Sequence, residues 1–321
     1  MAHVVVTRPL IENGLVDLRD EHTVTVCDPP SGSARSEAEL IELTDGADVL
    51  LSVLADPLTE PVFDACPDLK MVAQYAVGVD NIDLAAAEAH DVVVTHTPEV
   101  LTDATADFTW ALLLAAARHV KAADQFVRDG QFERWETTLL LGTELADKTM
   151  GIVGLGRIGA AVARRALGFG MDVVYHNRER ANPTVERQTG ARYVDLDELL
   201  ATSDVVSLHC PFNEDSHHLI DAAALRRMKD TALLVNTARG EVVDEAALVE
   251  ALENDEIAGA ALDVFENEPD VHPGLLERDR VVLAPHLGSA TTETRRKMAQ
   301  MCADSIRARF NGGEDIPHRI V

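Results

Sequence analysis

A glycine-rich hexapeptide, GLGRIG at 154–159, separates an apolar run from an amphipathic stretch. The run TMGIVG (149–154) has the length of a buried strand, and AAVARRALGFG follows as a helix. Strand, glycine turn and helix in this order are typical of a dinucleotide-binding fold. Gly154 would allow the tight turn, Gly156 the approach of a pyrophosphate, and Gly159 close packing of helix on strand. The other loop residues expected to face the phosphates at the helix N-terminus are Leu155, Arg157 and Ile158.

Short apolar runs alternate with helical stretches on both sides of this motif. Four of them, near the N-terminus, occupy 3–7, 47–54, 69–76 and 91–96. Seven more occupy 149–154, 172–177, 191–194, 204–209, 231–236, 257–264 and 280–285. This alternation predicts parallel sheets covered by helices. We expect an α/β protein with two doubly wound domains, a dinucleotide-binding domain over 101–290 and a smaller domain formed by 1–100 with 291–321.

The stretch between the two series predicts one long helix. It begins at the capping residues Thr102, Asp103 and Thr105 and runs to Gly130. Its centre is almost entirely apolar, which predicts burial between domains or subunits. Residues 131–147 are expected to be irregular.

The charge balance excludes several classes of partner. The 321 residues include 28 Lys and Arg against 55 Asp and Glu, a net charge of −27, and only five of the basic residues are Lys. Such a field repels nucleic acids and anionic lipid surfaces. The hydrophobic fraction of 46% still allows a core. Excess acid with little Lys favours adaptation to molar salt, where the Debye length is about 3 Å; acidity for solubility alone is the alternative.

Cysteine usage and the N-terminus point to a reducing compartment. The four Cys (27, 66, 210 and 302) are far apart and form no CxxC pair, which argues against a disulfide framework or a zinc site, and no metal is expected. The opening MAHVVVTRPL lacks the basic region of a signal peptide, and the apolar run near 111–117 is too short for a membrane span. These features predict a cytoplasmic protein.

The end of the second predicted strand of the larger domain bears on cofactor choice. An NAD site carries Asp or Glu there, but this chain has Asn177, followed by Arg178 and Arg180. From 175 to 192 there are four Arg and two Glu, a local charge of +2. Arginine forks suit a phosphate. The sequence therefore favours NADP(H), with NAD(H) tolerated, unless these arginines only pair with the glutamates of a solvated loop.

Three polar residues follow the ends of three predicted strands, namely Arg239, Glu268 and His286. The carboxyl ends of parallel strands border the ligand crevice, so these side chains are expected to converge. Glu268 would orient His286, which would give a proton to a carbonyl oxygen as hydride arrives at carbon. Arg239 would polarise that carbonyl and hold a neighbouring carboxylate. Taken singly, each residue has a structural alternative: Arg239 could form an ion pair on a loop, Glu268 could be a surface acid, and His286 could cap a helix.

Over nearly its whole length the chain resembles the D-isomer-specific 2-hydroxyacid dehydrogenase family, most closely its glyoxylate/hydroxypyruvate reductase branch. The motifs that carry the resemblance are YAVGVDNID (75–83), TDATADFTWALLLAAAR (102–118), WETTLLLGTEL (135–145), GLGRIG (154–159), YHNR (175–178), LHCPFNEDSHHLI (208–220), LLVNTARGEVVDEAAL (233–248), AALDVFENEP (260–269) and APHLGSAT (284–291). It implies a Rossmann-type cofactor domain and a smaller flavodoxin-like substrate domain, and a homodimer in which the long helix contributes to the interface.

The resemblance also implies roles for individual residues. Arg239, Glu268 and His286 would be the catalytic set, and the backbone amides of Val77 and Gly78 would bind the substrate carboxylate. Other substrate contacts would come from Leu54 and Trp135. Other cofactor contacts would come from Thr105, Cys210, Pro211, Ser216, Thr237, Ala238, Asp263 and Gly288, with Arg239 and His286 also beside the nicotinamide.

The expected function is the interconversion of 2-keto acids and D-2-hydroxy acids. The loop at 51–56 contains no basic residue, which favours an unphosphorylated substrate, and the end of the chain soon after Gly313 argues against a serine-regulated phosphoglycerate dehydrogenase. Two alternatives remain at this point: a nucleotide-sensing, corepressor-like binding protein on the same fold, and a phosphoglycerate- or formate-type dehydrogenase.

Overall fold

The computed structural model describes residues 1–11, 15–28, 34–312 and 315–321. The chain divides into two compact units, which are treated separately below. The first unit comprises 1–101 with 290–321, and the second comprises 102–289.

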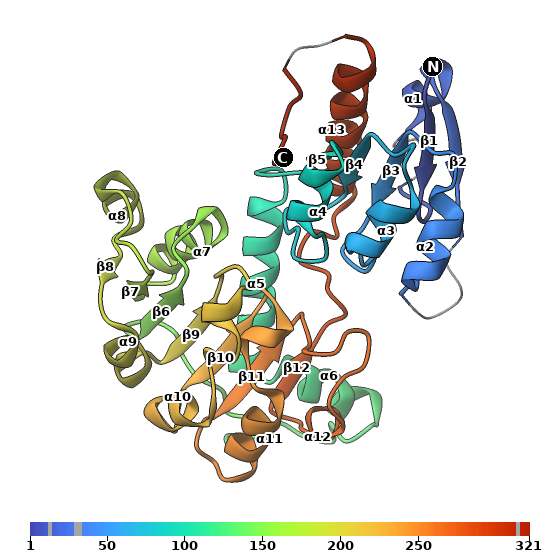
Figure 1. The fold of residues 1–321 in the computed structure, drawn as a ribbon. Helices are drawn as coiled ribbons and strands as arrows, with labels where there is room; N and C mark the ends of the chain where they lie inside the picture. Colours follow the sequence, from blue (N-terminus) through green and yellow to red (C-terminus); the bar gives the residue numbers. More distant parts are fainter. Residues whose placement is uncertain (12–14, 29–33, 313–314) are drawn as a thin grey trace. The chain divides into compact units, whose positions relative to one another are not determined.

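The described part of the first unit is built on a five-stranded parallel sheet in the order β2-β1-β3-β4-β5 (Figure 1). Its strands are β1 His3–Val6, β2 Thr23–Val26, β3 Val49–Ser52, β4 Met71–Gln74 and β5 Val93–Thr95. Its helices are α1 Val16–Glu21, α2 Glu37–Thr44, α3 Glu60–Ala65, α4 Leu84–Ala89 and the C-terminal α13 Thr292–Phe310. Since α13 packs on β4, both ends of the chain build this unit.

The second unit is built on a seven-stranded parallel sheet in the order β12-β11-β10-β9-β6-β7-β8 (Figure 1). Its strands are β6 Thr149–Val153, β7 Asp172–His176, β8 Arg192–Tyr193, β9 Val205–Leu208, β10 Leu233–Asn236, β11 Gly259–Leu262 and β12 Val281–Leu283. Its helices are α5 Thr102–Ala117, α6 Val120–Arg128, α7 Arg157–Gly168, α8 Pro183–Thr189, α9 Leu196–Thr202, α10 Ala222–Arg227, α11 Glu245–Glu253 and α12 Pro273–Leu276. The order reverses beside β6, which is where ligands bind to such sheets.

The two sheets confirm the predicted α/β class with two parallel-sheet units. All seven apolar runs predicted from 149 onward are strands, and so are the four predicted nearer the N-terminus. The sequence analysis did not predict β2. Its residues, TVTV, alternate between exposed and half-buried at the edge of the sheet, so the segment lacks the apolar run that marks the other strands.

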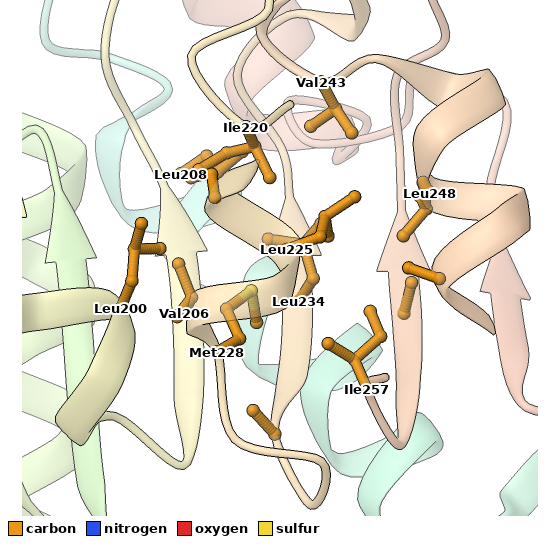
Figure 2. Packing of buried hydrophobic residues seen from close by; sticks show 14 of the residues in the cluster. Leu200, Val206, Leu208, Ile220, Leu225, Met228, Leu234, Val243, Leu248 and Ile257 are labelled. Atoms are coloured by element: carbon orange, nitrogen blue, oxygen red, sulfur yellow. The ribbon is translucent and has the colours of Figure 1, made fainter. Parts of the chain in front are cut away.

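Helices α9, α10 and α11 cover one face of the second sheet (Figure 2). Leu200, Leu225 and Leu248, one from each helix, are at most 1% exposed and pack in one cluster with Val206 and Leu234 of the central strands. Burying side chains of this size contributes about 1.5–3 kcal/mol each to stability. This core holds the carboxyl ends of β9 and β10 in fixed positions.

Helices α5 and α7 cover the opposite face. Neighbouring residues of a strand point to opposite faces, and Val235 accordingly belongs to a different cluster from Leu234. Trp110 of α5 stacks on Phe169 with ring centroids 4.2 Å apart and donates its indole N–H to the Val162 carbonyl oxygen at 3.1 Å. The apolar centre of α5, expected between domains or subunits, thus packs into the core of its own unit.

The predicted single helix from 102 to 130 is in fact two helices, α5 and α6. They are separated at His119, which has a left-handed φ of 51°. The segment at 142–143 crosses the end of α5, where the Thr143 amide donates to the Ala117 carbonyl oxygen at 2.7 Å. A Cβ on Gly142 would lie 2.4 Å from that oxygen, so only glycine allows this approach. A long-range contact therefore ends the helix. No helix in the described part of the chain is long and apolar enough to cross a bilayer.

Candidate active site

The turn after β6 has the geometry of a phosphate-binding loop. Gly154 has a φ of 98°, and a Cβ there would lie 2.6 Å from the backbone at 209–210. A Cβ on Gly159 would lie 2.1 Å from the Gly154 carbonyl oxygen, so the packing of α7 on the turn also requires glycine. By contrast, a Cβ on Gly156 would meet nothing within 4 Å. Glycine at 156 therefore leaves open space in front of the N-terminus of α7, where backbone amides attract an anion.

A pocket of about 860 Å³ opens at this turn, at the carboxyl ends of β6, β7 and β9. Its lining includes several residues proposed from the sequence as cofactor contacts, namely Gly154, Leu155, Gly156, Asn177, Arg178, Cys210, Pro211 and Ser216. The lining also includes residues that the sequence analysis did not assign, namely Val153, His176, Glu179, His209, Asn213, Asp215 and Leu219. The position of the pocket, where the strand order reverses, agrees with the general rule for such sheets.

Two side chains shape the far end of the pocket. The Asn177 side-chain oxygen accepts a hydrogen bond from the Leu155 amide at 2.6 Å, so it ties the end of β7 to the glycine turn. The Arg178 guanidinium donates to Asp215 at 3.1 Å, and both of these side chains are about three-quarters exposed. A neutral amide and an accessible guanidinium therefore stand where an NAD site carries an acidic side chain.

Arg180, unlike Asn177 and Arg178, is held by an ion pair outside the pocket lining. It donates to both carboxylate oxygens of Glu186, at 2.8 and 3.1 Å, and Glu186 also accepts the Tyr175 hydroxyl at 2.7 Å. These bonds hold the pKa of Glu186 below its usual value. Arg180 is not among the residues that line the pocket, so its expected contact with a phosphate is not supported. Of the arginines in the 175–192 segment, Arg178 is the one in the lining.

Two other pocket residues have strongly shifted pKa values. Burial of the ring lowers the pKa of His209 to about 3, so the imidazole stays neutral and bonds with the Ser207 hydroxyl at 2.8 Å. Burial raises the pKa of the Cys210 thiol to about 11. Cys210 is therefore a neutral, weakly polar wall of the pocket.

The segment after β12 is fastened by Asp263. Both oxygens of this buried carboxylate accept backbone amides, from Leu287 at 2.6 Å and from Gly288 at 2.8 Å. Burial raises the pKa of Asp263, while these two bonds lower it. A Cβ on Gly288 would contact both Asp263 and Thr105. Asp263, one of the expected cofactor contacts, binds two backbone amides of its own unit and so positions the segment that carries His286.

Glu268 and His286 form a hydrogen-bonded pair. His286 Nδ1 lies 2.9 Å from Glu268 Oε2, and the other oxygen of Glu268 accepts the Phe265 amide at 3.0 Å. His286 has a left-handed φ of 56°, and its amide donates to the Asp263 carbonyl oxygen at 2.8 Å. Since the pair uses Nδ1, the imidazole can present Nε2 to a reacting group. This is the arrangement of an oriented general acid.

Arg239 stands on a loop that packs against the Glu268 loop. It follows β10, and the Asn236 side chain fixes the loop by donating to the Arg239 carbonyl oxygen at 2.7 Å and accepting the Ala238 amide at 3.0 Å. A Cβ on Gly240 would lie 1.9 Å from the Phe265 backbone. Thr237, from the same loop, bonds through its hydroxyl with Thr109 at 2.9 Å. The loops that carry the three candidate catalytic residues therefore meet at the carboxyl edge of β10 to β12.

The candidate substrate residues of the first unit lie on loops at the ends of β3 and β4. The Val77 carbonyl oxygen bonds with His96 Nδ1 at 2.9 Å, and the Gly78 carbonyl oxygen accepts Gln74 at 3.4 Å. Within the described residues, no hydrogen bond is made by the Val77 or Gly78 amide. These amides are the groups expected to bind a carboxylate. Leu54 is half-buried on the loop after β3.

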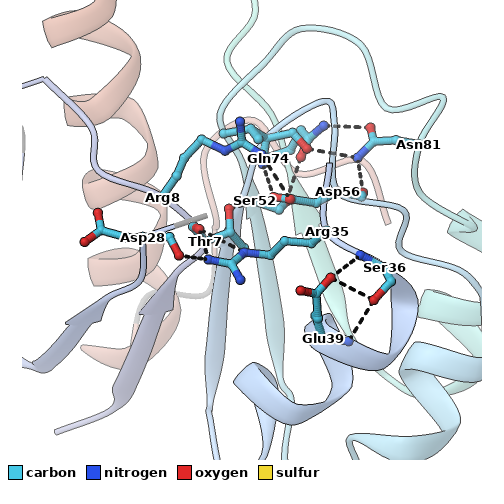
Figure 3. Close-up of polar contacts among 11 residues, drawn as sticks. Thr7, Arg8, Asp28, Arg35, Ser36, Glu39, Ser52, Asp56, Gln74 and Asn81 are labelled. Carbon is cyan, nitrogen blue, oxygen red and sulfur yellow. Dashed lines mark hydrogen bonds and ion pairs between the residues drawn. The ribbon is translucent and has the colours of Figure 1, made fainter. Parts of the chain in front are cut away.

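A polar network holds that loop (Figure 3). Asp56 is fully buried, and its Oδ2 accepts the Thr7 hydroxyl at 2.6 Å and the Val53 amide at 2.9 Å. Arg8 Nη2 lies 3.5 Å from Asp56 Oδ1. A basic residue thus stands beside the 51–56 loop, although the loop itself has none. Arg8 follows β1 and is far from this loop in the sequence. The composition of the loop therefore could not indicate that a basic side chain lies beside it.

Trp135 lies in the second unit, on the irregular stretch that follows α6. Its side chain is 77% exposed, and Phe132 and Leu141 on the same stretch are also exposed. Contacts within this unit therefore do not explain why these large apolar side chains are exposed.

Comparisons with known proteins agree with this geometry. Residues 110–288 match the family model described as D-isomer specific 2-hydroxyacid dehydrogenase, NAD binding domain. A glyoxylate reductase of Korarchaeum cryptofilum is 48% identical over 99% of this chain and 95% of its own length. One from Thermococcus onnurineus is 47% identical, with the same coverage of each chain.

Solved structures are similar over the full length. A glyoxylate reductase from Paecilomyes thermophila has a TM-score of 0.87 and 33% identity over 99% of this chain and 98% of that one. An NADPH-dependent glyoxylate/hydroxypyruvate reductase from Sinorhizobium meliloti, in complex with NADP and malonate, has a TM-score of 0.89 and 33% identity over 100% and 97%. With these likenesses and the family match, the chain belongs to the D-isomer-specific 2-hydroxyacid dehydrogenases, oxidoreductases that interconvert 2-keto and 2-hydroxy acids.

Proposed function

We propose that this protein reduces small, unphosphorylated 2-keto acids of the glyoxylate class, to D-2-hydroxy acids where the product is chiral, with NADPH preferred over NADH. The observation that carries the proposal is the Glu268–His286 pair, at 2.9 Å, on a loop edge shared with Arg239. The pair supplies an oriented proton donor, and the neighbouring arginine supplies a positive charge for a carbonyl and a carboxylate.

The residues of the pocket fit a dinucleotide. The open space at Gly156 and the N-terminus of α7 suit a pyrophosphate, and Arg178 beside Asn177 suits a 2′-phosphate. When bound, the reduced cofactor supplies the hydride that the carbonyl carbon accepts. The structural relative from Sinorhizobium meliloti is described as NADPH-dependent, which supports the preference proposed here. NADH is expected to bind more weakly because it has no 2′-phosphate to bond with Arg178.

The reduction needs one proton, and His286 is proposed to supply it. As the carbonyl carbon takes the hydride, the carbonyl oxygen takes the proton from His286 Nε2 and becomes the hydroxyl. Glu268 stabilises the protonated imidazole and sets the orientation of its ring. Arg239 polarises the carbonyl and offers its fork to the carboxylate. In the reverse direction, His286 accepts the proton from the hydroxyl.

The substrate class is proposed from the first unit. The Val77 and Gly78 amides, which have no acceptor among the described residues, suit a substrate carboxylate. The charge of Arg8 is already opposed by Asp56, so this basic residue does not favour a substrate phosphate. Curated relatives at 47–48% identity are glyoxylate reductases, which supports a small 2-keto acid.

We further propose a homodimer that works in a reducing, salt-rich cytoplasm. Exposed Phe132, Trp135 and Leu141 lie within one short stretch, and apolar side chains gathered in this way are typical of an interface. The four cysteines are free, which is in keeping with a reducing compartment. The net charge of −27 supports adaptation to molar salt.

The test is the loss of absorbance at 340 nm with a chain-length series of 2-keto acids, with NADPH and NADH, at low and molar salt. We expect the highest kcat/KM with glyoxylate or its near homologues and NADPH. Phosphorylated keto acids and keto acids with bulky side chains form the comparison set, and formate is tested separately by the gain of absorbance with NADP⁺ and NAD⁺. Cofactor binding without turnover on the whole series would instead favour a nucleotide-sensing protein.

A further inference from the structure

Two histidines and a glutamate gather in the second unit, and none of them lines the nucleotide pocket. Ligand atoms of His217, His218 and Glu266 all lie within 4.8 Å of one another. His218 Nε2 is 2.7 Å from Glu266 Oε1, and the two imidazole rings stack with centroids 4.0 Å apart. We propose that these three residues bind a divalent transition-metal ion, of which Zn²⁺ is the representative.

The backbone brings these side chains together from separate loops. His217 follows the 3₁₀ turn Glu214–Ser216, and its amide donates to the Asn213 carbonyl oxygen at 3.0 Å. His218 has a left-handed φ of 48°, and its amide donates to the Glu241 carbonyl oxygen at 2.9 Å. This conformation is uncommon for a residue with a side chain. Here it places two successive imidazoles face to face, and since ring-nitrogen lone pairs lie in the ring plane, the exposed His217 ring must turn out of the stack for both rings to bind one ion.

Glu266 and Asp244 stand on opposite sides of the His218 ring. Glu266 is held by its own amide, which donates to Glu245 Oε1 at 2.9 Å. Asp244 Oδ2 is 4.0 Å from His218 Nδ1. When Nε2 binds a metal, a carboxylate at Nδ1 orients the ring and strengthens the ligand. The two carboxylates thus have distinct roles in the proposal: Glu266 is a ligand, and Asp244, now beyond hydrogen-bond distance, must approach Nδ1 to orient His218.

The ligand atoms decide the class of ion. Two imidazole nitrogens and one carboxylate oxygen suit Zn²⁺, Co²⁺ or Ni²⁺, whereas Mg²⁺ and Ca²⁺ prefer oxygen ligands alone. At metal–ligand distances of about 2.0–2.2 Å, tetrahedral ligands stand about 3.4 Å apart, so ligand atoms separated by up to 4.8 Å must approach by up to about 1.4 Å. His217 is exposed, which leaves its side chain room to turn. Water would complete the coordination.

An ion at this position would connect two loops near the catalytic pair. Glu266 is two residues before Glu268. The hydrogen bond from the Phe265 amide to Glu268 Oε1, at 3.0 Å, spans Glu266 and fixes the loop that carries both glutamates. Binding would therefore hold the 217–218 segment to the loop that carries Glu268. The proposal does not depend on which keto acid is reduced or on cofactor preference.

The test uses the full chain, freed of metal with EDTA, in molar KCl so that diffuse binding to carboxylates is screened. ZnCl₂ is titrated by calorimetry, and CoCl₂ by the visible spectrum, which reports nitrogen and oxygen ligation directly. We expect one equivalent bound at micromolar metal, with a higher melting temperature. His217→Gln and Glu266→Gln should each weaken binding by about tenfold or more, and millimolar Mg²⁺ should not compete.

His90→Gln is the matched control. His90 Nε2 lies 3.0 Å from Asp64, an exposed histidine–carboxylate pair without a second imidazole, so its loss should leave metal binding unchanged. The proposal is overturned if no saturable equivalent binds, or if either cluster variant binds Zn²⁺ as tightly as the parent protein. In both cases the contact between His218 and Glu266 is only a hydrogen bond. Circular dichroism of the variants is used to check that a loss of metal binding is not caused by a loss of fold.

Discussion

His286 Nδ1 and Glu268 Oε2 lie 2.9 Å apart, although the two residues are 18 positions apart in the sequence. Each residue of this pair is positioned by backbone groups, Glu268 by the Phe265 amide and His286 by the Asp263 carbonyl oxygen. The imidazole therefore enters the reaction with its ring orientation already set, which reduces the cost of aligning the proton donor.

Replacing Glu268 by Gln tests this orientation. The amide keeps the size of the side chain but loses the charge that stabilises a protonated imidazole. We expect kcat to fall at least about tenfold, with little change in the KM for the cofactor. Steady-state kinetics with both substrates varied measures this, and unchanged kcat would show that Glu268 has no part in the proton transfer.

Asp215→Asn tests the proposed cofactor preference. The Asp215 carboxylate lies 3.1 Å from the Arg178 guanidinium in the pocket lining. It would compete with a 2′-phosphate for this guanidinium, and its negative charge would repel the phosphate. Since the pair is exposed, we expect a modest gain, about two- to fivefold in kcat/KM for NADPH and little change for NADH.

Arg178→Ala is the partner variant, and it should lower kcat/KM for NADPH while leaving that for NADH nearly unchanged. The comparison is made at molar and at reduced salt, because added salt weakens both contacts of Arg178. A parallel response of NADH and NADPH to both variants would remove Arg178 from the account of specificity.

The Cys210 thiol offers a test of pocket polarity. Burial raises its pKa to about 11, so the reactive thiolate is scarce below that pH and grows as the pH rises toward it. We expect iodoacetamide to alkylate Cys210 slowly at pH 8, and faster in steps toward pH 11. Mass spectrometry of digested samples follows the site, with unfolded protein as the reference. Alkylation at pH 8 as fast in the folded as in the unfolded chain would contradict the buried environment.

Much of the fold is readable from the sequence because each buried strand is a short apolar run. Two features differ. Strand β2 is an exposed edge whose residues TVTV alternate between exposed and half-buried, so its signal is the alternation of β-branched residues, which a search for apolar runs misses. The break between α5 and α6 comes from the 142–143 segment, which is distant in sequence, so local patterns carry no signal for it.

The candidate site divides in the same way. Arg239, Glu268 and His286 are each marked by a strand that ends just before them, and this rule needs no knowledge of side-chain pairing. Side-chain pairing is what the sequence leaves open: it allows Arg180 either a phosphate or a glutamate, and the structure shows the bond with Glu186, while Asp263 binds the backbone at 287–288. Such contacts depend on loop conformations that only the folded chain defines.

The net charge leads to a prediction about salt. With −27 on the chain, lowering the ionic strength removes the screening of carboxylate repulsion. We expect the melting temperature and the activity to fall together on dialysis into low salt, and to recover when KCl is restored before aggregation. Differential scanning calorimetry across a salt series measures this. An unchanged melting curve with full activity at low salt would leave acidity as a solubility feature only.

The central claim is that His286 donates the proton, and its replacement by Asn measures this most directly. His90→Gln serves as the control, because that histidine lies in the other unit and pairs with Asp64 on the surface. We predict a loss of about 10²–10⁴-fold in kcat for His286→Asn, with NADPH binding, followed by fluorescence titration, close to that of the parent. Near-normal turnover in His286→Asn, at parent levels of NADPH binding, would contradict the mechanism.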